Sequence, residues 1–336
     1  MSMTMDGAPA STGSGAEKTS PKAEKAGIGV GGIIRRTVLG SLVGVNLVGA
    51  YVLGGMLLTE RIDNDTNFQP PVVTEGGLAS VDITVALIER EVDEYAWVSN
   101  EPFFMPGHWL PNMRHYQQGV VYGVSRFAME LADSLGRSRS ATAVDPDLDS
   151  AAGLLRFPGD VWIFDFEQTW TPVVTSEEQY MSAVRKLQAY NARIASGQAI
   201  FDPRRDNLLT TLTRIEADVS SKINILSDHV EGVAAGRDVE TQTNEVFYLM
   251  KGRLYAYTML LKALEKDFAS VIEAEGLTLT WDNMIASFEN AASLKPFIVT
   301  NSAPGSVFIP NHVSEIGFFA LRAKTQLRDV MTVLSQ

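Results

Sequence analysis

The chain has 336 residues, no cysteine and a formal net charge of −12. Without cysteine it cannot form disulfides, thiolate metal sites or thiol nucleophiles. Residues 1–59 carry five basic and three acidic residues, or +2, so residues 60–336 carry −14 (−12 minus +2). Such an acidic domain repels the phosphates of nucleic acids, so no nucleic-acid partner is expected.

The longest apolar stretch runs from Thr37 to Thr59 without a charged residue and directly follows Arg35 and Arg36. A bilayer core about 30 Å thick requires roughly 20 apolar residues in helical form. We therefore expect a single transmembrane helix over residues 33–59. Its length favours a retained anchor over a cleaved signal peptide, whose apolar core is about 7–15 residues long.

The basic residues beside the span predict its orientation. The side of a membrane helix that is richer in Lys and Arg stays in the cytoplasm. Arg35 and Arg36 precede the span, whereas Glu60-Arg-Ile-Asp63 follows it. We expect a cytoplasmic tail over residues 1–32, a bacterial inner-membrane anchor and a C-terminal domain in the periplasm. The tail has almost no large apolar side chain and is expected to be disordered.

Three residues in the span could mediate contact with another membrane helix. Gly40 and Gly44 form a G-x-x-x-G pattern, and Asn46 lies near the middle of the span. Small residues four apart let two helices approach closely in lipid, and a buried amide favours a polar partner. Association of the span with itself or with another protein is one interpretation. The other is that glycine is simply frequent in membrane helices.

Helical periodicity dominates the rest of the chain. Residues 60–79 are rich in Pro, Gly and Asp and predict a linker to a domain over residues 80–336. Ser80 is expected to cap the first helix of that domain, and Ser176 with Gln179 to form a capping box. The apolar spacing predicts helices at about 80–95, 117–135, 146–156, 176–196, 205–231, 243–275, 281–294 and 313–334.

One short run resembles a strand. Residues Val161 to Phe166 are rich in aromatic and β-branched side chains, although a buried extended segment would read the same way. A single strand cannot form a sheet, so the predicted fold class is mainly α. We expect the transmembrane helix followed by an antiparallel helical bundle outside the cytoplasm. The bundle is expected as one domain or as two subdomains that meet near residues 170–200.

The stretch Asn100–His115 combines aromatic, proline and charged residues in a predicted loop. Long ordered loops on rigid scaffolds often carry function. In one interpretation its side chains form a pocket for a ligand or a partner. In the other, its aromatic rings fill a gap in the core and its polar groups satisfy turns. The candidate residues are Glu101, Phe103, Phe104, His108, Trp109, Asn112, Arg114 and His115.

The sequence offers no recognisable catalytic or metal-binding motif. The four histidines lack the H-E-x-x-H spacing of zinc enzymes. Asp165 and Glu167 could share acid and base roles, but acids two residues apart are common. We therefore predict no catalytic residue, no metal and no cofactor.

Several segments of the chain together resemble a known family. These segments are Trp97–Asn100, Pro102–Pro106, Asn112-Met113, Gln117–Gly119, Val144–Asp147, Ala151–Leu155, Phe157–Gly159, Ala189–Asn191, Gly197–Ala199, Asp206–Leu209, Lys251-Gly252, Tyr255-Ala256, Pro310–His312 and Leu321–Leu327. Together they resemble a proteobacterial family catalogued as domain of unknown function 2333. The resemblance implies a mostly helical envelope protein anchored in the inner membrane, and it transfers no catalytic residue.

Three functions are consistent with these features. The first expectation is a non-catalytic envelope protein that binds or scaffolds a protein partner. The second is a module that binds a small envelope ligand, a lipid or a glycan through the 100–115 loop. The third is a hydrolase. An exposed apolar patch would favour the first, an aromatic cavity near Trp109 the second, and perturbed carboxylates or histidines in a cleft the third.

Overall fold

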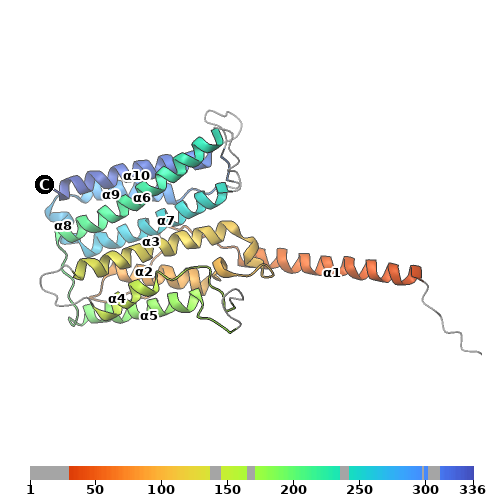
Figure 1. Ribbon diagram of the computed structural model, residues 1–336. Helices are drawn as coiled ribbons and strands as arrows, with labels where there is room; N and C mark the ends of the chain where they lie inside the picture. Colours follow the sequence, from red (N-terminus) through yellow and green to blue (C-terminus); the bar gives the residue numbers. More distant parts are fainter. Residues whose placement is uncertain (1–29, 137–144, 165–170, 235–241, 297–298, 302–310) are drawn as a thin grey trace, which may run out of the picture. The chain divides into compact units, whose positions relative to one another are not determined.

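The computed structural model describes residues 30–136, 145–164, 171–234, 242–296, 299–301 and 311–336. Within these ranges it contains helices and isolated bridges but no strand, which confirms the predicted mainly-α class (Figure 1). The predicted disordered tail lies almost entirely outside these ranges. The α-helices are α1 (Val30–Thr59), α2 (Ala79–Glu89), α3 (Pro111–Gly136), α4 (Pro146–Leu154), α5 (Ser176–Ala195), α6 (Arg205–Ala234), α7 (Thr243–Asp267), α8 (Ala269–Ala274), α9 (Thr278–Ala292) and α10 (His312–Leu334).

Helix α1 contains the expected apolar span. Its segment Ile34–Thr59 is long and apolar enough to cross a membrane, as an anchor or as a signal sequence, and none of it is buried. A methyl group added to Gly40 or Gly44 would meet nothing within 4 Å. The Asn46 side-chain amide donates to the Leu42 carbonyl oxygen at 2.8 Å, so one of its N–H groups is satisfied within the helix.

By its contacts the chain separates into two compact units, residues 1–49 and 50–336. In the larger unit, α3 and α7 form the centre, α6, α9 and α10 lie on one side, and α2, α4 and α5 lie on the other (Figure 1). Helices α5, α6, α7, α9 and α10 alternate in direction along the bundle, which is the expected antiparallel arrangement.

The central pair α3 and α7 is an exception because these helices run parallel. They pack closely where Gly119 meets Gly252 and where Gly123 meets Ala256. A Cβ atom on Gly252 would lie 2.2 Å from the Tyr116 carbonyl oxygen, so only glycine fits there. This close approach positions the buried side chains of both helices, including Tyr116.

The first helix of the bundle is capped by a residue distant in sequence. Ser80 is not the N-cap, as the sequence suggested; the helix begins after Leu78, and Ser80 lies in its first turn. The Asp267 carboxylate, at the end of α7, accepts hydrogen bonds from the backbone N–H groups of Ala79 at 2.7 Å and Ser80 at 2.9 Å. Free N–H groups at a helix start favour such an acceptor.

Two further helix boundaries differ from the prediction. The capping box of α5 is formed by Thr175 and Glu178, one residue before the expected pair. Ser176 instead donates its hydroxyl to the Pro158 carbonyl oxygen at 2.8 Å. The helix predicted over 243–275 is broken at Phe268 into α7 and α8, and the Phe268 ring is buried against Phe201.

The segment between α1 and α2 is fixed to the bundle by its backbone. The carbonyl oxygens of Asp63 and Asp65 accept hydrogen bonds from the hydroxyls of Tyr116 and Tyr255. The buried Asn64 side chain donates to the Ala292 carbonyl oxygen at 2.9 Å. These bonds join the predicted linker to α3, α7 and α9.

The strand-like run forms one isolated antiparallel bridge, Phe164 with Pro172. The Val173 N–H donates to the Ile163 carbonyl oxygen at 3.0 Å. Asp165, Phe166 and Glu167 lie outside the described residues.

Candidate functional site

The predicted 100–115 loop is shorter than expected because α3 begins at Pro111. Proline suits the first position of a helix, since its fixed φ is already helical and its missing N–H would have no partner there. Asn112, Arg114 and His115 therefore lie in the first turns of α3. Two short 3-10 helices precede α3: η2 (Val98–Asn100) and then, inside the loop, η3 (Pro106–Trp109).

The aromatic side chains of this loop lie on the surface and do not fill the core. Phe103 is 71% exposed, Phe104 50% and Trp109 52%. They join the bridge segment, because the ring centroids of Phe104 and Trp162 are 5.8 Å apart and those of Trp162 and Phe164 5.5 Å. We call Phe103, Phe104, Trp109, Trp162 and Phe164 the aromatic ridge.

The polar candidates Glu101, His108 and Arg114 lie together behind the ridge. His108 Nδ1 is 2.9 Å from the Glu101 carbonyl oxygen, and Arg114 Nη2 donates to the His108 carbonyl oxygen at 3.2 Å. Burial raises the pKa of the Glu101 carboxyl, although the nearby Gly107 and His108 N–H groups oppose the rise. These contacts are mostly to backbone, so the three residues fix the shape of the loop.

The other two polar candidates are partly buried. The Asn112 side-chain oxygen is enclosed and has no hydrogen-bond partner among the described residues. Burial lowers the pKa of His115, against the opposing charge of Glu245 on α7. The structure thus gathers Glu101, His108 and Arg114 with the aromatic residues, while His115 lies toward α7.

A small second core lies beneath the ridge. Val98, Leu110 and Met113 are buried together, with Met56 and Ile62 packed against them. Met56 belongs to the last turns of α1, which fall in the same compact unit as the bundle. One residue earlier, a Cβ atom on Gly55 would lie 2.3 Å from Pro106 Cγ, so the η3 turn rests on the helix backbone.

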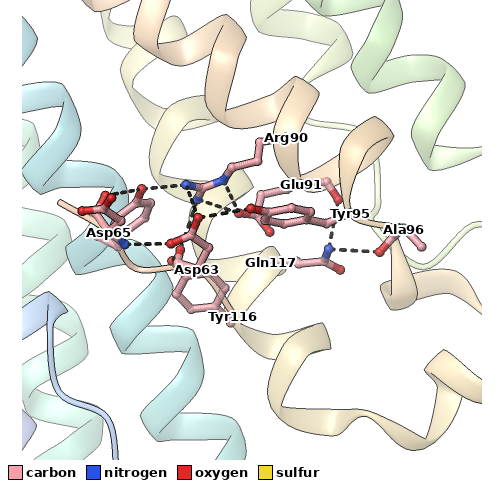
Figure 2. A network of polar contacts seen from close by, with 9 residues as sticks. Asp63, Asp65, Arg90, Glu91, Tyr95, Ala96, Tyr116 and Gln117 are labelled. Atoms are coloured by element: carbon pink, nitrogen blue, oxygen red, sulfur yellow. Dashed lines mark hydrogen bonds and ion pairs between the residues drawn. The ribbon is translucent and has the colours of Figure 1, made fainter. Parts of the chain in front are cut away.

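A second unusual site is a buried polar network that the sequence analysis missed (Figure 2). Arg90 and Glu91 are both buried, and Arg90 Nη2 lies 2.8 Å from Glu91 Oε1. Arg90 also donates to the Tyr255 hydroxyl at 2.8 Å and lies 3.7 Å from the Asp63 carboxylate. The network therefore joins the residues just after α2, and α7, to the segment that follows α1.

A π-helix, η1 (Arg90–Glu94), brings these charged residues into the interior. In it the Tyr95 N–H donates to the Arg90 carbonyl oxygen at 2.8 Å, one residue further than in an α-helix. The wider turn directs the adjacent Arg90 and Glu91 inward. The signal available in the sequence was this charged pair between the apolar residues Ile88 and Val92.

Burial is the largest influence on the pKa values of Arg90 and Glu91 in this network. It raises the pKa of Glu91 to about 7, even though Arg90 favours the charged carboxylate. Burial alone would lower the pKa of Arg90, but Glu91 and Tyr255 overcome this effect and raise it. Glu91 is fully enclosed, so a substrate cannot reach it, and we interpret the network as structural.

No group of three or more His, Asp or Glu residues among the described residues is arranged to hold a metal ion. The two sites are thus an exposed aromatic surface and an enclosed polar network.

These features define a helical bundle preceded by one apolar helix that can cross a membrane. The chain matches the family model described as "Uncharacterized protein conserved in bacteria (DUF2333)" over residues 73–336, and it belongs to this family. The resemblance seen in the sequence is therefore confirmed. None of the curated proteins and none of the solved structures compared with the chain matches it.

Proposed function

We propose that this protein is a non-catalytic scaffold of the bacterial envelope, held in the inner membrane by α1, whose bundle binds another protein. The observation that carries the proposal is an apolar groove of about 270 Å³ between α6 and α10. Phe318 is 62% exposed and Leu321 47% exposed beside it. Exposed apolar patches of this kind on soluble domains mark interaction sites.

The groove suits a helix of a protein partner. Its walls are two packed helices, with Leu226 and Val230 on α6 facing Phe318 and Leu321 on α10. A third helix can lay an apolar stripe into such a groove.

The charge around the groove suggests the chemistry of that helix. The groove residues are flanked in sequence by three exposed acids, Asp228, Glu231 and Glu315, and by one exposed base, Arg322. The domain as a whole is also acidic. The proposed partner therefore presents an amphipathic helix whose apolar stripe is bordered by Lys or Arg.

The proposed orientation places the N-terminus in the cytoplasm and the bundle in the periplasm. It follows from Arg35 and Arg36 before the span and the mixed charges after it. Alkaline phosphatase fused after Gln336 should be active in cells. A fusion that is inactive although the chain is made would contradict this orientation.

Site-specific photocrosslinking at native expression tests the scaffold. A photoreactive residue at Phe318 or Leu321 of the full chain should give the same crosslinked protein, and one at Leu279 should not. Leu279 is a matched control because it is 73% exposed on α9. A peptide of the crosslinked helix should then bind the purified chain and lose at least tenfold in affinity to Phe318→Glu. No crosslink at either position, or equal crosslinks at Leu279, would overturn the proposal.

The other two expectations are less well supported by the geometry. The loop aromatics are half or more exposed, whereas a ligand pocket would enclose them. Glu91, whose carboxyl pKa burial raises to about 7, lies in the interior and not in a cleft.

A further inference from the structure

The aromatic ridge is a continuous series of rings on the surface of the bundle unit, in which Trp162 is half-buried and the other four side chains are exposed. The rings of Phe103 and Phe104 are 5.6 Å apart, and the series continues through Trp162 to Phe164. Trp109 joins it by donating its indole N–H to the Phe103 carbonyl oxygen at 2.9 Å. Such a cluster in water is unfavourable unless another apolar phase covers it.

The ridge is held in a fixed shape. The Met105 N–H donates to the Pro102 carbonyl oxygen at 2.9 Å, and the His108 N–H to the Met105 carbonyl oxygen at 3.2 Å. Behind it, Leu110 and Met113 are buried in the second core. The loop that carries the rings is therefore already ordered. Contact with another surface would cost it little conformational entropy.

The end of the apolar span lies beside this loop. Counting about 20 helical residues from Thr37 places the far edge of the hydrocarbon at about Met56. Gly55 is at that edge, and its backbone touches the Pro106 ring. Phe103, Phe104 and Trp109 are each within three residues of Pro106. With α1 across a bilayer, as proposed above, the loop would therefore lie at the level of the lipid headgroups.

We propose that the aromatic ridge inserts into the lipid interface beside α1 and seats the bundle on the membrane in one orientation. The proposal rests on the anchoring of α1 proposed above. Trp side chains favour this interfacial layer because they combine an apolar ring with a polar indole N–H, and the Phe rings of the ridge add apolar surface for the acyl boundary. The acidic domain gains nothing from anionic headgroups, so the contact is with the acyl boundary of zwitterionic lipid.

Spin labels can measure this contact because the chain has no cysteine. Single variants Phe103→Cys and Trp109→Cys of the full chain would be labelled in phosphatidylcholine nanodiscs. At both positions the label should collide more with lipid-soluble oxygen than with a water-soluble nickel complex. Leu279→Cys, exposed on α9, should show the reverse.

A label in α1 separates this proposal from the anchoring on which it rests. Val45→Cys reports the bilayer, since Val45 is 70% exposed on the span. If position 45 contacts lipid while positions 103 and 109 contact water, the ridge proposal is overturned and the anchor remains. If position 45 itself contacts water, the anchor fails. Labels at 103 and 109 that are shielded from both reagents would indicate a protein contact and would also overturn the lipid proposal.

A second variant tests the side chains themselves. With a label at Phe104→Cys, the added changes Phe103→Ser and Trp109→Ser should lower the oxygen collision rate at least twofold, with the chain still in the nanodisc. An unchanged rate would show that these rings do not hold the loop in lipid.

Discussion

Gly119 of α3 and Gly252 of α7 lie back to back where the two central helices run closest. A Cβ atom on either residue would lie 3.1 Å from the Cα atom of the other. The contact brings the buried Tyr116 and Tyr255 side chains together, with ring centroids 6.1 Å apart. Those tyrosines in turn donate hydrogen bonds to the segment that follows α1, so the packing of α3 on α7 and the attachment of this segment depend on the same crossing.

Gly252→Ala should destabilise the bundle by about 2–3 kcal/mol, because its methyl group would overlap the Tyr116 carbonyl oxygen and force the helices apart. Gly153→Ala is the matched control, since a methyl group there meets nothing within 4 Å. That change should stabilise α4 by about 0.5 kcal/mol through helix propensity. Chemical unfolding followed by circular dichroism would compare them. Equal effects would refute the close-packing account.

The helices could be predicted because their apolar spacing is a local property. The predicted helix boundaries were wrong where a contact with a distant residue sets the end of the helix, or where two capping patterns overlap in the sequence. Thr175 with Glu178 and Ser176 with Gln179 both fit a capping box, and the sequence does not distinguish them. The break at Phe268 has no glycine or proline to mark it; the buried contact with Phe201 accompanies it.

The candidate site was predictable only in part, for the same reason. The density of aromatic residues singled out the loop, but the contact of Phe104 with Trp162 of the bridge segment, about 60 residues later, forms only in the fold. The buried network was out of reach, because Arg90 finds Tyr255 and Asp63 only when the chain has folded. A charged pair inside an apolar helix face is the sequence signal that was available.

Asp267→Ala should destabilise the protein by about 1–2 kcal/mol, the usual effect of losing a helix cap. The reason is that Ala79 and Ser80 would lose the acceptor for their N–H groups. Amide hydrogen exchange should rise most at the start of α2. Asp282→Ala, at an exposed position of α9, serves as the control. If exchange rose equally throughout the bundle, the change would reflect a general loss of packing.

Glu91→Gln should remove part of the pH dependence of stability. The folded-state pKa of about 7 lies above the usual 4.5, so the folded state binds the extra proton. The stabilisation from that proton is complete below pH 4.5 and is lost as the pH rises through 7. As the pH rises from 4.5 to 7.5, the free energy of unfolding of the variant should therefore increase by about 1–3 kcal/mol relative to that of the wild type.

Unfolding of both proteins at each pH measures this difference. Asp93→Asn is the control, since Asp93 is exposed in the same π-helix. A wild-type and variant difference that stays constant with pH would mean that Glu91 remains charged in the folded protein.

Lys251→Met should stabilise the protein at neutral pH. Lys251 is 2% exposed, and burial together with Lys295 lowers its pKa to about 8 from the usual 10.5. The folded state therefore releases a proton that the unfolded state keeps, and wild-type stability rises as the pH goes from 8 to 10.5. Methionine has a similar length and no charge, so it should raise the free energy of unfolding by about 1–3 kcal/mol at pH 7 and abolish the rise between pH 8 and 10.5.

Lys266→Met, at an exposed position of the same helix, is the control and should have neither effect. Loss of stability in Lys251→Met at pH 7 would show that the buried ammonium contributes favourable contacts, such as its position 5.8 Å from the Tyr248 ring centroid.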